Sequence, residues 1–442
     1  MNGELKGTSE VSFQRSRKGS AADRQKVVPF PAPPQLGSGA RAGLFRRLLP
    51  GIVTGASDVD PSLVITATVA GAAFHYSLLW TVILCVPFLL SVFAVSARIG
   101  LETRQGLVDL LRSNYGQIVA VTCGLMVVAI NMAMIVADLM AVTDAFSIIV
   151  ELPRSYFIAA VAFSVWYVLI FRDYRKITHT LALLALPLFI YVAAAILARP
   201  DWGQVITHSL FPRIPRNPGY PVAIIAIFGS LLTPYVLVWQ TSSRREAALA
   251  GERFEAGSGA EHHAGTAVTT VLCYSIMVAS ATVLQVPLAG NLTTRMAAAA
   301  LTPAVGSLGT ILFALGIIGA GMVALPVLIA SMCYSVAEAM GWKSGLNERP
   351  WEAVRFYVMI SAAVFLASAL NFIRLNPVQV LYWSQILAGI LTVPILIFIL
   401  LVSNDRRVMR TTNSWWQNFW IGASGGAILA AALIVLWWNV SG

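Results

Sequence analysis

The stretch GIVTGASDVDPSLVITATVAGAAF, residues 51–74, decides the fold, because it is apolar enough to cross a bilayer yet carries acids and a proline in its middle. Pro61 has no backbone N–H and its ring clashes with the preceding turn, so a continuous helix should break there. Asp60 then lies near the bilayer midplane, where a charge costs roughly 2.5–3.5 kcal/mol on insertion scales. A broken helix frees carbonyls that can join a carboxylate around a cation. We therefore predict a cation site at Asp60. The alternative is a proline kink with Asp60 facing a water-filled crevice for structural reasons.

The composition of the whole chain predicts a polytopic helical membrane protein. The chain is 57% hydrophobic and only 11% charged, and its mean hydropathy is +0.75. No soluble domain of this length needs that much apolar surface, and the excess falls in runs about 20 residues long. The formal charge of +10 is explained by basic cytoplasmic loops in a bilayer, so we expect no nucleic-acid partner. The cysteines lack metal-type spacing, which predicts neither a disulfide framework nor a zinc site: Cys85, Cys123, Cys273 and Cys333.

The order of apolar runs predicts a tail, eleven spans and their lengths. Residues 1–42 are polar and basic with no signal-peptide region before the first span, so they should form a disordered cytoplasmic tail. The third and eighth runs exceed one bilayer thickness, so each should tilt or extend beyond the membrane. The predicted spans are residues 50–75, 79–98, 117–147, 154–171, 177–198, 219–242, 265–288, 307–339, 352–372, 378–402 and 416–439.

Charges in the predicted loops set the orientation. Alternate loops are rich in Lys and Arg, as in residues 98–112, 172–176, 244–253, 343–349 and 406–410, whereas the opposite set is poorer for its length. The positive-inside rule then places the N-terminus in the cytoplasm and the C-terminus outside. We expect a multi-pass protein of the bacterial inner membrane.

The sixth span repeats the anomaly of the first. The run AIIAIFGSLLTPYVLVWQTS, residues 223–242, has Gly229, Ser230, Thr233 and Pro234 in its middle. Spans one and six open two five-span halves, residues 50–198 and 219–402, and 416–439 is an additional span. Interrupted helices in corresponding positions of two halves point to a midplane site between inverted repeats. No residue-level repeat relates the halves, so this inference rests on the breaks and the span count.

Between residues 43 and 402 the chain resembles the NRAMP-type divalent-metal transporters. The resemblance is carried by the motifs GASDVDPS (55–62), AGAAFHYSLLW (70–80), RIGLETRQGL (98–107), LLTPY (231–235) and NPVQVLYWSQILAGILTVPI (376–395). It implies an all-α transporter core at 43–402 with the fold of sodium-coupled amino-acid transporters. It also implies a metal held between unwound spans one and six.

The chain departs from the family's pattern at the positions that the resemblance assigns to metal and protons. Where the family has Asp-Pro-Gly-Asn, this chain has Asp60-Pro61-Ser62-Leu63, and where the family has Met-Pro-His, it has Thr233-Pro234-Tyr235. The family has a further His in the same helix, five residues beyond the Met-Pro-His motif, and this chain has Gln240 there. In span three the family's Glu and Asp, part of a proton path, correspond to Asn131 and Asp138. These departures together resemble the magnesium-transporting branch related to NRAMP.

The residue types favour a hard cation without reference to the family. Carboxylate, carbonyl and hydroxyl oxygens suit Mg, Ca and Mn, and Mg²⁺ keeps several waters. We predict ligands from Asp60, Thr233, Gln385 and carbonyls near Ser57 and Ser230. Three alternatives stay open. Asp58 either supplies charge behind the ligands or lies in the outer vestibule, Thr233 could be ordinary helix packing, and Gln385 could be an interhelical hydrogen-bond partner.

The sequence therefore predicts a transporter for Mg²⁺ or Mn²⁺ that works by alternating access with little or no proton coupling. It needs no cofactor, and its oligomeric state is open. One alternative is a proton-coupled Mn²⁺/Fe²⁺ transporter, and another is a channel-like cation conductor, although paired broken helices favour alternating access over a pore. An enzyme is not expected: GASG at 422–425 is followed by no His, and no His-Glu-x-x-His occurs.

Overall fold

The computed structural model describes residues 59–171, 186–249, 259–284, 292–346, 348–373 and 375–441. All of them belong to one compact unit, Ser38–Gly442. Throughout these ranges the regular elements are helices. The predicted tail 1–42, together with Ser57 and Asp58, lies outside the described residues.

The helices follow the apolar runs of the sequence. The first half contains α2 (Pro61–Phe74), η1 (His75–Leu78), α3 (Leu79–Thr103), α4 (Leu107–Tyr115), α5 (Gln117–Val150), α6 (Ser155–Phe171), η2 (Leu186–Phe189), α8 (Ile190–Leu197) and α9 (Trp202–Leu210). The second half contains α10 (Gly219–Leu231), α11 (Pro234–Leu249), α12 (Gly259–Val283), α13 (Thr294–Ala298), η3 (Ala299–Leu301), α14 (Thr302–Val305), η4 (Gly306–Leu308), α15 (Gly309–Met340), α16 (Val354–Asn371), α17 (Pro377–Asn404) and α18 (Trp415–Ser441).

The eleven predicted spans all have helical counterparts among the described residues. Eight helical segments are long and apolar enough to cross a membrane, and two shorter apolar ones match the fourth and fifth predicted spans. The first of the eight, Pro61–Thr103, covers predicted spans one and two. The count of eleven therefore agrees with the structure.

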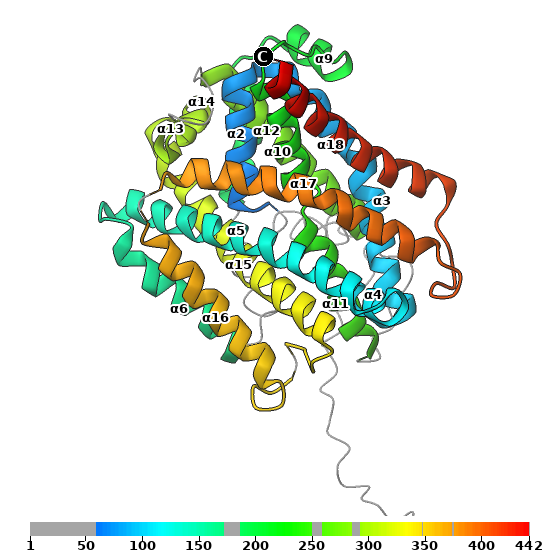
Figure 1. The fold of residues 1–442 in the computed structure, drawn as a ribbon. Helices are drawn as coiled ribbons and strands as arrows, with labels where there is room; N and C mark the ends of the chain where they lie inside the picture. The colour runs from blue at the N-terminus through cyan, green and yellow to red at the C-terminus, as the bar shows by residue number, and fades with distance from the viewer. Residues whose placement is uncertain are drawn as a thin grey trace, which may run out of the picture. The chain divides into compact units, whose positions relative to one another are not determined.

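Two long helices form the centre of the packing. α5 has 34 residues and α15 has 32, so each extends over about 50 Å and exceeds the hydrocarbon thickness. They lie side by side and run obliquely to α2 (Figure 1). Tilting, as predicted for the third and eighth spans, is how such long helices fit a bilayer.

Glycines let the helices around the broken segments approach closely. A Cβ at Gly71 of α2 would lie 2.5 Å from the Met277 carbonyl oxygen of α12. A Cβ at Gly229 of α10 would lie 2.1 Å from the Gln385 carbonyl oxygen of α17, and one at Gly389 of α17 would lie 2.4 Å from the Ile225 carbonyl oxygen. Small residues at helix contacts are how membrane helices gain van der Waals packing. These contacts hold α2 against α12 and α10 against α17.

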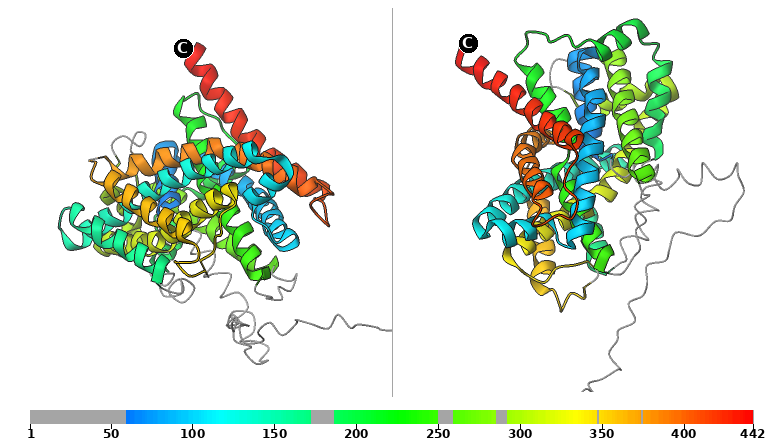
Figure 2. Two further views of the ribbon diagram at one scale, coloured as in Figure 1. Left: turned by 60° about the horizontal axis from the view of Figure 1, so that its bottom comes forward. Right: turned by 90° about the vertical axis from the view of Figure 1, so that its right-hand side faces the viewer.

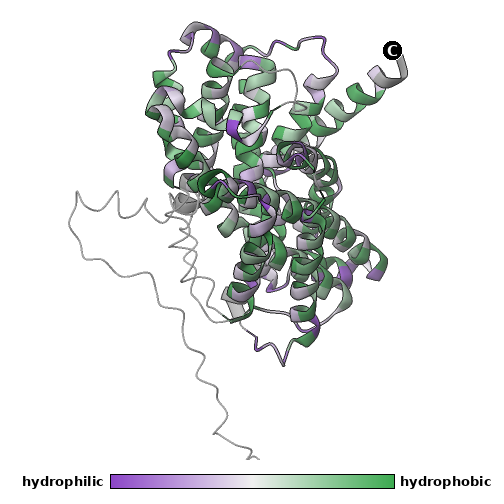
Figure 3. Ribbon diagram, turned by 90° about the vertical axis from the view of Figure 1, so that its left-hand side faces the viewer, coloured by the Kyte–Doolittle hydropathy of each residue, from purple (hydrophilic) through white to green (hydrophobic). Residues whose placement is uncertain are grey.

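The outer faces are apolar, as expected beside lipid. Large hydrophobic side chains are exposed on peripheral helices, among them Phe163 of α6, Phe365 of α16 and Trp437 of α18. Colouring by hydropathy shows green along the helices and purple mainly near their ends and in the connections (Figure 3). α18 packs on α17 and α3 at one edge of the bundle (Figure 2).

Candidate metal site at two broken helices

The first broken helix resumes at Pro61. Val59 and Asp60 are not helical, and Asp60 is the N-cap of α2 with extended backbone angles, φ −84° and ψ 166°. Its Oδ1 accepts a hydrogen bond from the Leu63 N–H at 2.7 Å. An acidic side chain at this position satisfies a free N–H and complements the positive end of the helix dipole. The start of a helix at Pro61 agrees with the predicted break; what precedes Val59 lies outside the described residues.

The second broken helix confirms the predicted interruption of span six and moves its position slightly. α10 ends at Leu231, Leu232 has φ −93° and ψ 44°, and α11 begins at Pro234. Gly229 and Ser230 lie in the last turn of α10 rather than in the break itself. Because Pro234 has no N–H, the Ser230 carbonyl loses the donor that a continuous helix would supply. The Ser230 hydroxyl donates to the Ile227 carbonyl at 3.0 Å, so the Ser230 carbonyl is its better candidate ligand.

A hydrogen bond joins the two breaks. The Tyr235 hydroxyl donates to Asp60 Oδ2 at 3.2 Å, and Asp60 is 1% exposed. Thr233 is also buried, between the end of α10 and the start of α11. The structure thus brings Asp60, Thr233 and Tyr235 to one buried junction at the ends of three half-helices.

α5 supplies a second carboxylate beside this junction. Asp138 Oδ1 accepts a hydrogen bond from the Ser62 hydroxyl of α2 at 2.6 Å. Asp138 Oδ2 has no hydrogen-bond partner among the described residues, and the bond to Ser62 places Asp138 against the first turn of α2, which begins directly after Asp60. Asn131, two turns earlier, donates through Nδ2 to the Leu328 carbonyl at 3.1 Å. α5 therefore contributes one acid beside the junction, whereas the Asn131 amide is bonded to α15.

Gln385 is the clearest unsatisfied polar group near the junction. It is fully buried on α17, where its backbone meets Gly229 in the last turns of α10. Neither its amide oxygen nor its amide nitrogen has a hydrogen-bond partner within the described ranges. A buried polar group without a partner costs roughly 1–3 kcal/mol, and such groups in native structures call for an explanation such as a bound ion. The interhelical hydrogen bond considered as an alternative is absent from the described part of the chain.

The remaining predicted residues are less central. Gln240 is half-buried on α11, five residues beyond Tyr235.

Among the described residues no group of three or more His, Cys, Asp or Glu side chains is placed to hold a metal. A divalent ion at the junction would therefore depend on Asp60 and neutral oxygens, with Asp138 behind them.

Two contacts at the junction were not predicted. Ser62 lies in the quoted Asp-Pro-Ser turn, but its bond to Asp138 links positions 76 apart in the sequence. The Ser331 hydroxyl of α15 donates to the Tyr235 carbonyl at 3.0 Å and so fixes the first turn of α11. Neither long-range partner leaves a local pattern in the sequence.

Comparison with known sequences identifies the family of the chain. A family model described as natural resistance-associated macrophage protein-like matches residues 51–438. The divalent metal cation transporter MntH of Latilactobacillus sakei subsp. sakei is 26% identical over 209 residues, 46% of this chain and 46% of that protein. The metal transporter NRAT1 of Oryza sativa subsp. japonica is 26% identical over 42% of this chain and 35% of its own length. The chain spans about half the length of the curated relatives it matches.

Comparison with solved structures confirms the predicted fold. A manganese transporter of Eremococcus coleocola superposes with a TM-score of 0.69 at 16% identity, covering 90% of this chain and 88% of that one. MhsT in complex with L-phenylalanine superposes with a TM-score of 0.51 at 16% identity, covering 90% of this chain and 99% of that one. At such identities the likeness concerns the fold, which is an all-helical membrane transporter architecture.

Proposed function

The chain belongs to the natural resistance-associated macrophage protein-like (Nramp) family, and from that premise we propose that it is a secondary transporter moving divalent metal cations by alternating access. Relatives named as divalent metal cation transporters support this proposal. They also support the prediction that the chain is a transporter and not an enzyme. The bilayer and the metal ion are then its partners, and the ion is its substrate rather than a cofactor.

The observation that carries the proposal is the Asp60–Tyr235 junction. It joins the N-terminus of α2 to the N-terminus of α11 beside the C-terminus of α10. The C-terminal end of a half-helix carries the negative end of its dipole and free carbonyls, both of which attract a cation. Asp60 adds a full charge, and the unsatisfied Gln385 amide oxygen adds a further ligand. A buried acid in this setting has a physical reason to exist if a cation binds there.

We infer that the preferred ions are Mg²⁺ and Mn²⁺, as in the magnesium-transporting branch. The support is the donor set: Asp60, Thr233, Gln385 and the Ser230 carbonyl are oxygen donors, with Ser57 and Asp58 as sequence-based additions. Such ligands suit Mg, Ca and Mn, whereas a thioether would favour softer ions. With few strong ligands, the site suits an ion that keeps part of its water shell, as Mg²⁺ does.

We further infer that transport is driven by the ion gradient and the membrane potential, with little proton movement. A doubly charged ion gains about 4.6 kcal/mol from 100 mV, at roughly 2.3 kcal/mol per charge. This is sufficient for inward concentration without a second ion. In the predicted orientation, with the N-terminus in the cytoplasm of a bacterial cell and the C-terminus outside, the potential favours uptake.

A second candidate is a proton-coupled Mn²⁺ or Fe²⁺ transporter, and one observation favours it. Asp138 is fully buried next to Asp60 and keeps one oxygen without a partner in the part of the chain that the structure describes. A carboxyl group so placed can hold a proton when the metal leaves. The two candidates differ in whether metal uptake acidifies the interior.

Purified protein in liposomes distinguishes these candidates. Uptake of Mg²⁺, Mn²⁺ and Ca²⁺ is followed at an imposed inside-negative potential, with a pH dye inside and protein-free liposomes as the control. We expect Mg²⁺ and Mn²⁺ to enter and the internal pH to stay constant. Stoichiometric acidification would establish the proton-coupled candidate. Ion flow that is linear in concentration up to high millimolar would indicate a channel-like conductor instead.

A further inference from the structure

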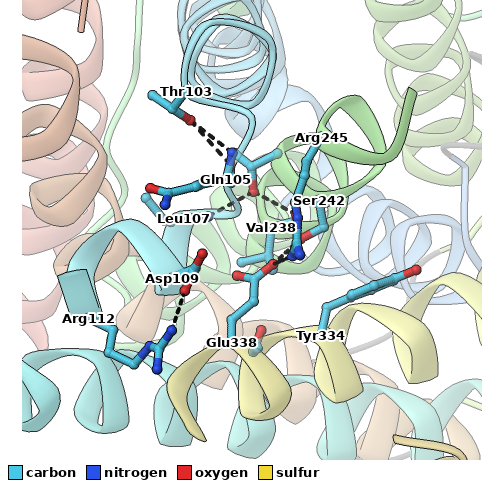
Figure 4. Close-up of polar contacts among 12 residues, drawn as sticks. Thr103, Gln105, Leu107, Asp109, Arg112, Val238, Ser242, Arg245, Tyr334 and Glu338 are labelled. Atoms are coloured by element: carbon cyan, nitrogen blue, oxygen red, sulfur yellow. Dashed lines mark hydrogen bonds and ion pairs between the residues drawn. The ribbon is translucent and has the colours of Figure 1, made fainter. Parts of the chain in front are cut away.

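Glu338 is a buried acid remote from the metal site. It lies in the last turn of α15, is 3% exposed, and meets residues from the α3–α4 turn and from α11 (Figure 4). The site described above does not use it. A buried acid needs charged or hydrogen-bonding partners to be tolerated. The neighbours of Glu338 therefore show which helices its carboxylate connects.

Two of these neighbours lie in the second half of α11. The Ser242 hydroxyl donates to Glu338 Oε1 at 2.9 Å, and Arg245 Nη1 lies 3.6 Å from the same oxygen. The side chain of Arg245 is 25% exposed and that of Glu338 is 1% exposed. α11 is therefore attached to α15 through a carboxylate that is shielded from solvent.

The third neighbour is the turn between α3 and α4. A Cβ at Gly106 would lie 1.8 Å from Glu338 Oε1 and 2.2 Å from Oε2. The backbone of Gly106, with φ −76° and ψ 164°, is open to any residue, so space for Glu338 is the reason for glycine here. The next residue also faces α11, since the Leu107 N–H donates to the Thr241 hydroxyl at 3.3 Å. The N-terminus of α4 thus receives a carboxylate and a hydroxyl from two other helices.

The ion pairs of Lys343 are exposed to solvent, unlike the contacts of Glu338. Lys343, just beyond α15, is 55% exposed and lies 2.8 Å from Glu348 and 3.2 Å from Glu352. Exposed pairs of this type contribute little, whereas removing one partner of a buried charge leaves the other uncompensated. Of the two sets, the contacts of Glu338 are the ones able to hold a helix in place.

The same helix, α11, carries Tyr235 in its first turn and the partners of Glu338 in its second half. Resting on the proposed function, we propose that Glu338 is a positioning residue of the transport cycle. Its contacts with Gly106, Ser242 and Arg245 latch α11 to α15 and α4, and they break when the metal site opens on that side of the membrane. By the charge distribution of the loops this is the cytoplasmic side.

A cysteine on α11 reports the latch directly. Val238 is fully buried on α11, so in V238C the thiol is protected while α11 stays in place. Labelling by an impermeant maleimide is measured in inside-out, metal-free vesicles. The same vesicles without V238C give the background from the native cysteines, which are all buried. We expect E338Q, which keeps the shape and removes the charge, to raise the labelling rate at least about tenfold.

Matched substitutions distinguish a specific effect of the Glu338 contacts on the labelling rate from a general destabilisation of the protein. G106A should raise the labelling rate like E338Q, because its Cβ displaces the Glu338 carboxylate. G422A is its control, since a Cβ at Gly422 meets nothing within 4 Å. K343A, which breaks only exposed pairs, should leave the rate unchanged. R245A should raise the rate in the wild-type background and add nothing to E338Q, because both act through one contact.

The proposal is overturned if E338Q and G106A label at the wild-type rate. It is also overturned if R245A and E338Q are fully additive, or if K343A has the same effect as E338Q. Size-exclusion chromatography of each variant confirms that it is folded before labelling. Because the assay contains no metal and measures no uptake, its result is independent of which ion is transported. Failure of the proposed function would appear instead in the wild-type liposome experiment.

Discussion

At the residue scale, Asp60 connects the fold to the proposed chemistry. One carboxylate oxygen caps α2 through the Leu63 N–H, and the other accepts from Tyr235 on α11. A cation that binds Asp60 therefore acts on the first turns of both half-helices. This coupling of ligand and helix position is what a conformational cycle requires.

Gln385 should show a trade-off between stability and function. Q385L removes the two unpartnered amide atoms, so the free energy of unfolding of the metal-free protein should rise by about 1–3 kcal/mol. Uptake of Mg²⁺ and Mn²⁺ should fall, because a ligand is lost. Thermal unfolding without metal and liposome uptake check the two halves of the prediction. N371L is the contrast: Asn371 donates to the Val136 and Ala367 carbonyls, so its loss should destabilise. A destabilised Q385L with normal uptake would contradict the role of Gln385.

Thr233 should set the preference between hard and soft ions. T233M places a thioether at the break, which should raise affinity for Mn²⁺ or Cd²⁺ relative to Mg²⁺ by about tenfold. T233V, which has neither hydroxyl nor sulfur, is the control and should weaken binding of all three ions. Competition of each metal against Mn²⁺ uptake measures the ratio. An unchanged ratio in T233M would place Thr233 in helix packing alone.

At the element scale, the breaks could be predicted because their causes are local. Pro61 and Pro234 each remove an N–H and forbid a preceding turn of helix. The exact position of the second break could not be read in the same way. Gly229 looks like a breaker, yet it is helical, and its missing side chain serves the contact with α17. A glycine that permits close approach cannot be told from one that ends a helix without the partner in view.

This contact predicts the effect of filling it. G229A would place a Cβ 2.1 Å from the Gln385 carbonyl oxygen and 2.6 Å from the Gly389 nitrogen. Because both are backbone atoms, α10 and α17 must separate, at a typical cost of about 1–3 kcal/mol. G426A on α18, where a Cβ meets nothing within 4 Å, should be neutral or slightly stabilising. Thermal unfolding in detergent compares the two, and equal stability would mean that the contact is looser than the structure shows.

At the scale of the whole molecule, hydropathy was sufficient to predict the membrane spans and insufficient to predict which residues of distant helices contact each other. Spans, their long members and their order follow from apolar runs, and all have helical counterparts among the described residues. Which helices touch depends on pairs such as Ser62–Asp138 and Glu338–Ser242, which lie 76 and 96 residues apart. Single positions in a hydrophobic sequence carry no sign of such distant partners. The helix interruptions at Pro61 and Pro234 were therefore predictable, because their causes are local, and the Glu338 contacts were not.

The orientation of the bundle is a prediction from loop charge. α9 and the C-terminal end of α18 lie at the top of Figure 1, with α4 and α11 lower. T207C on α9 should therefore react with impermeant thiol reagents from outside intact cells, and R407C, between α17 and α18, only after permeabilisation. Both positions are exposed. The reverse pattern would mean that the protein is inserted the other way round.

The central claim is that Asp60 binds the transported ion, and D60N tests it most directly. The substitution keeps the size of the side chain and removes its charge, which should ease insertion of the span rather than impair it. Mn²⁺ uptake into liposomes is measured for wild-type and D60N protein reconstituted at equal amounts, at an imposed inside-negative potential. We predict that D60N elutes as a folded protein yet reduces uptake to the level of protein-free liposomes. Wild-type uptake by folded D60N would contradict the account.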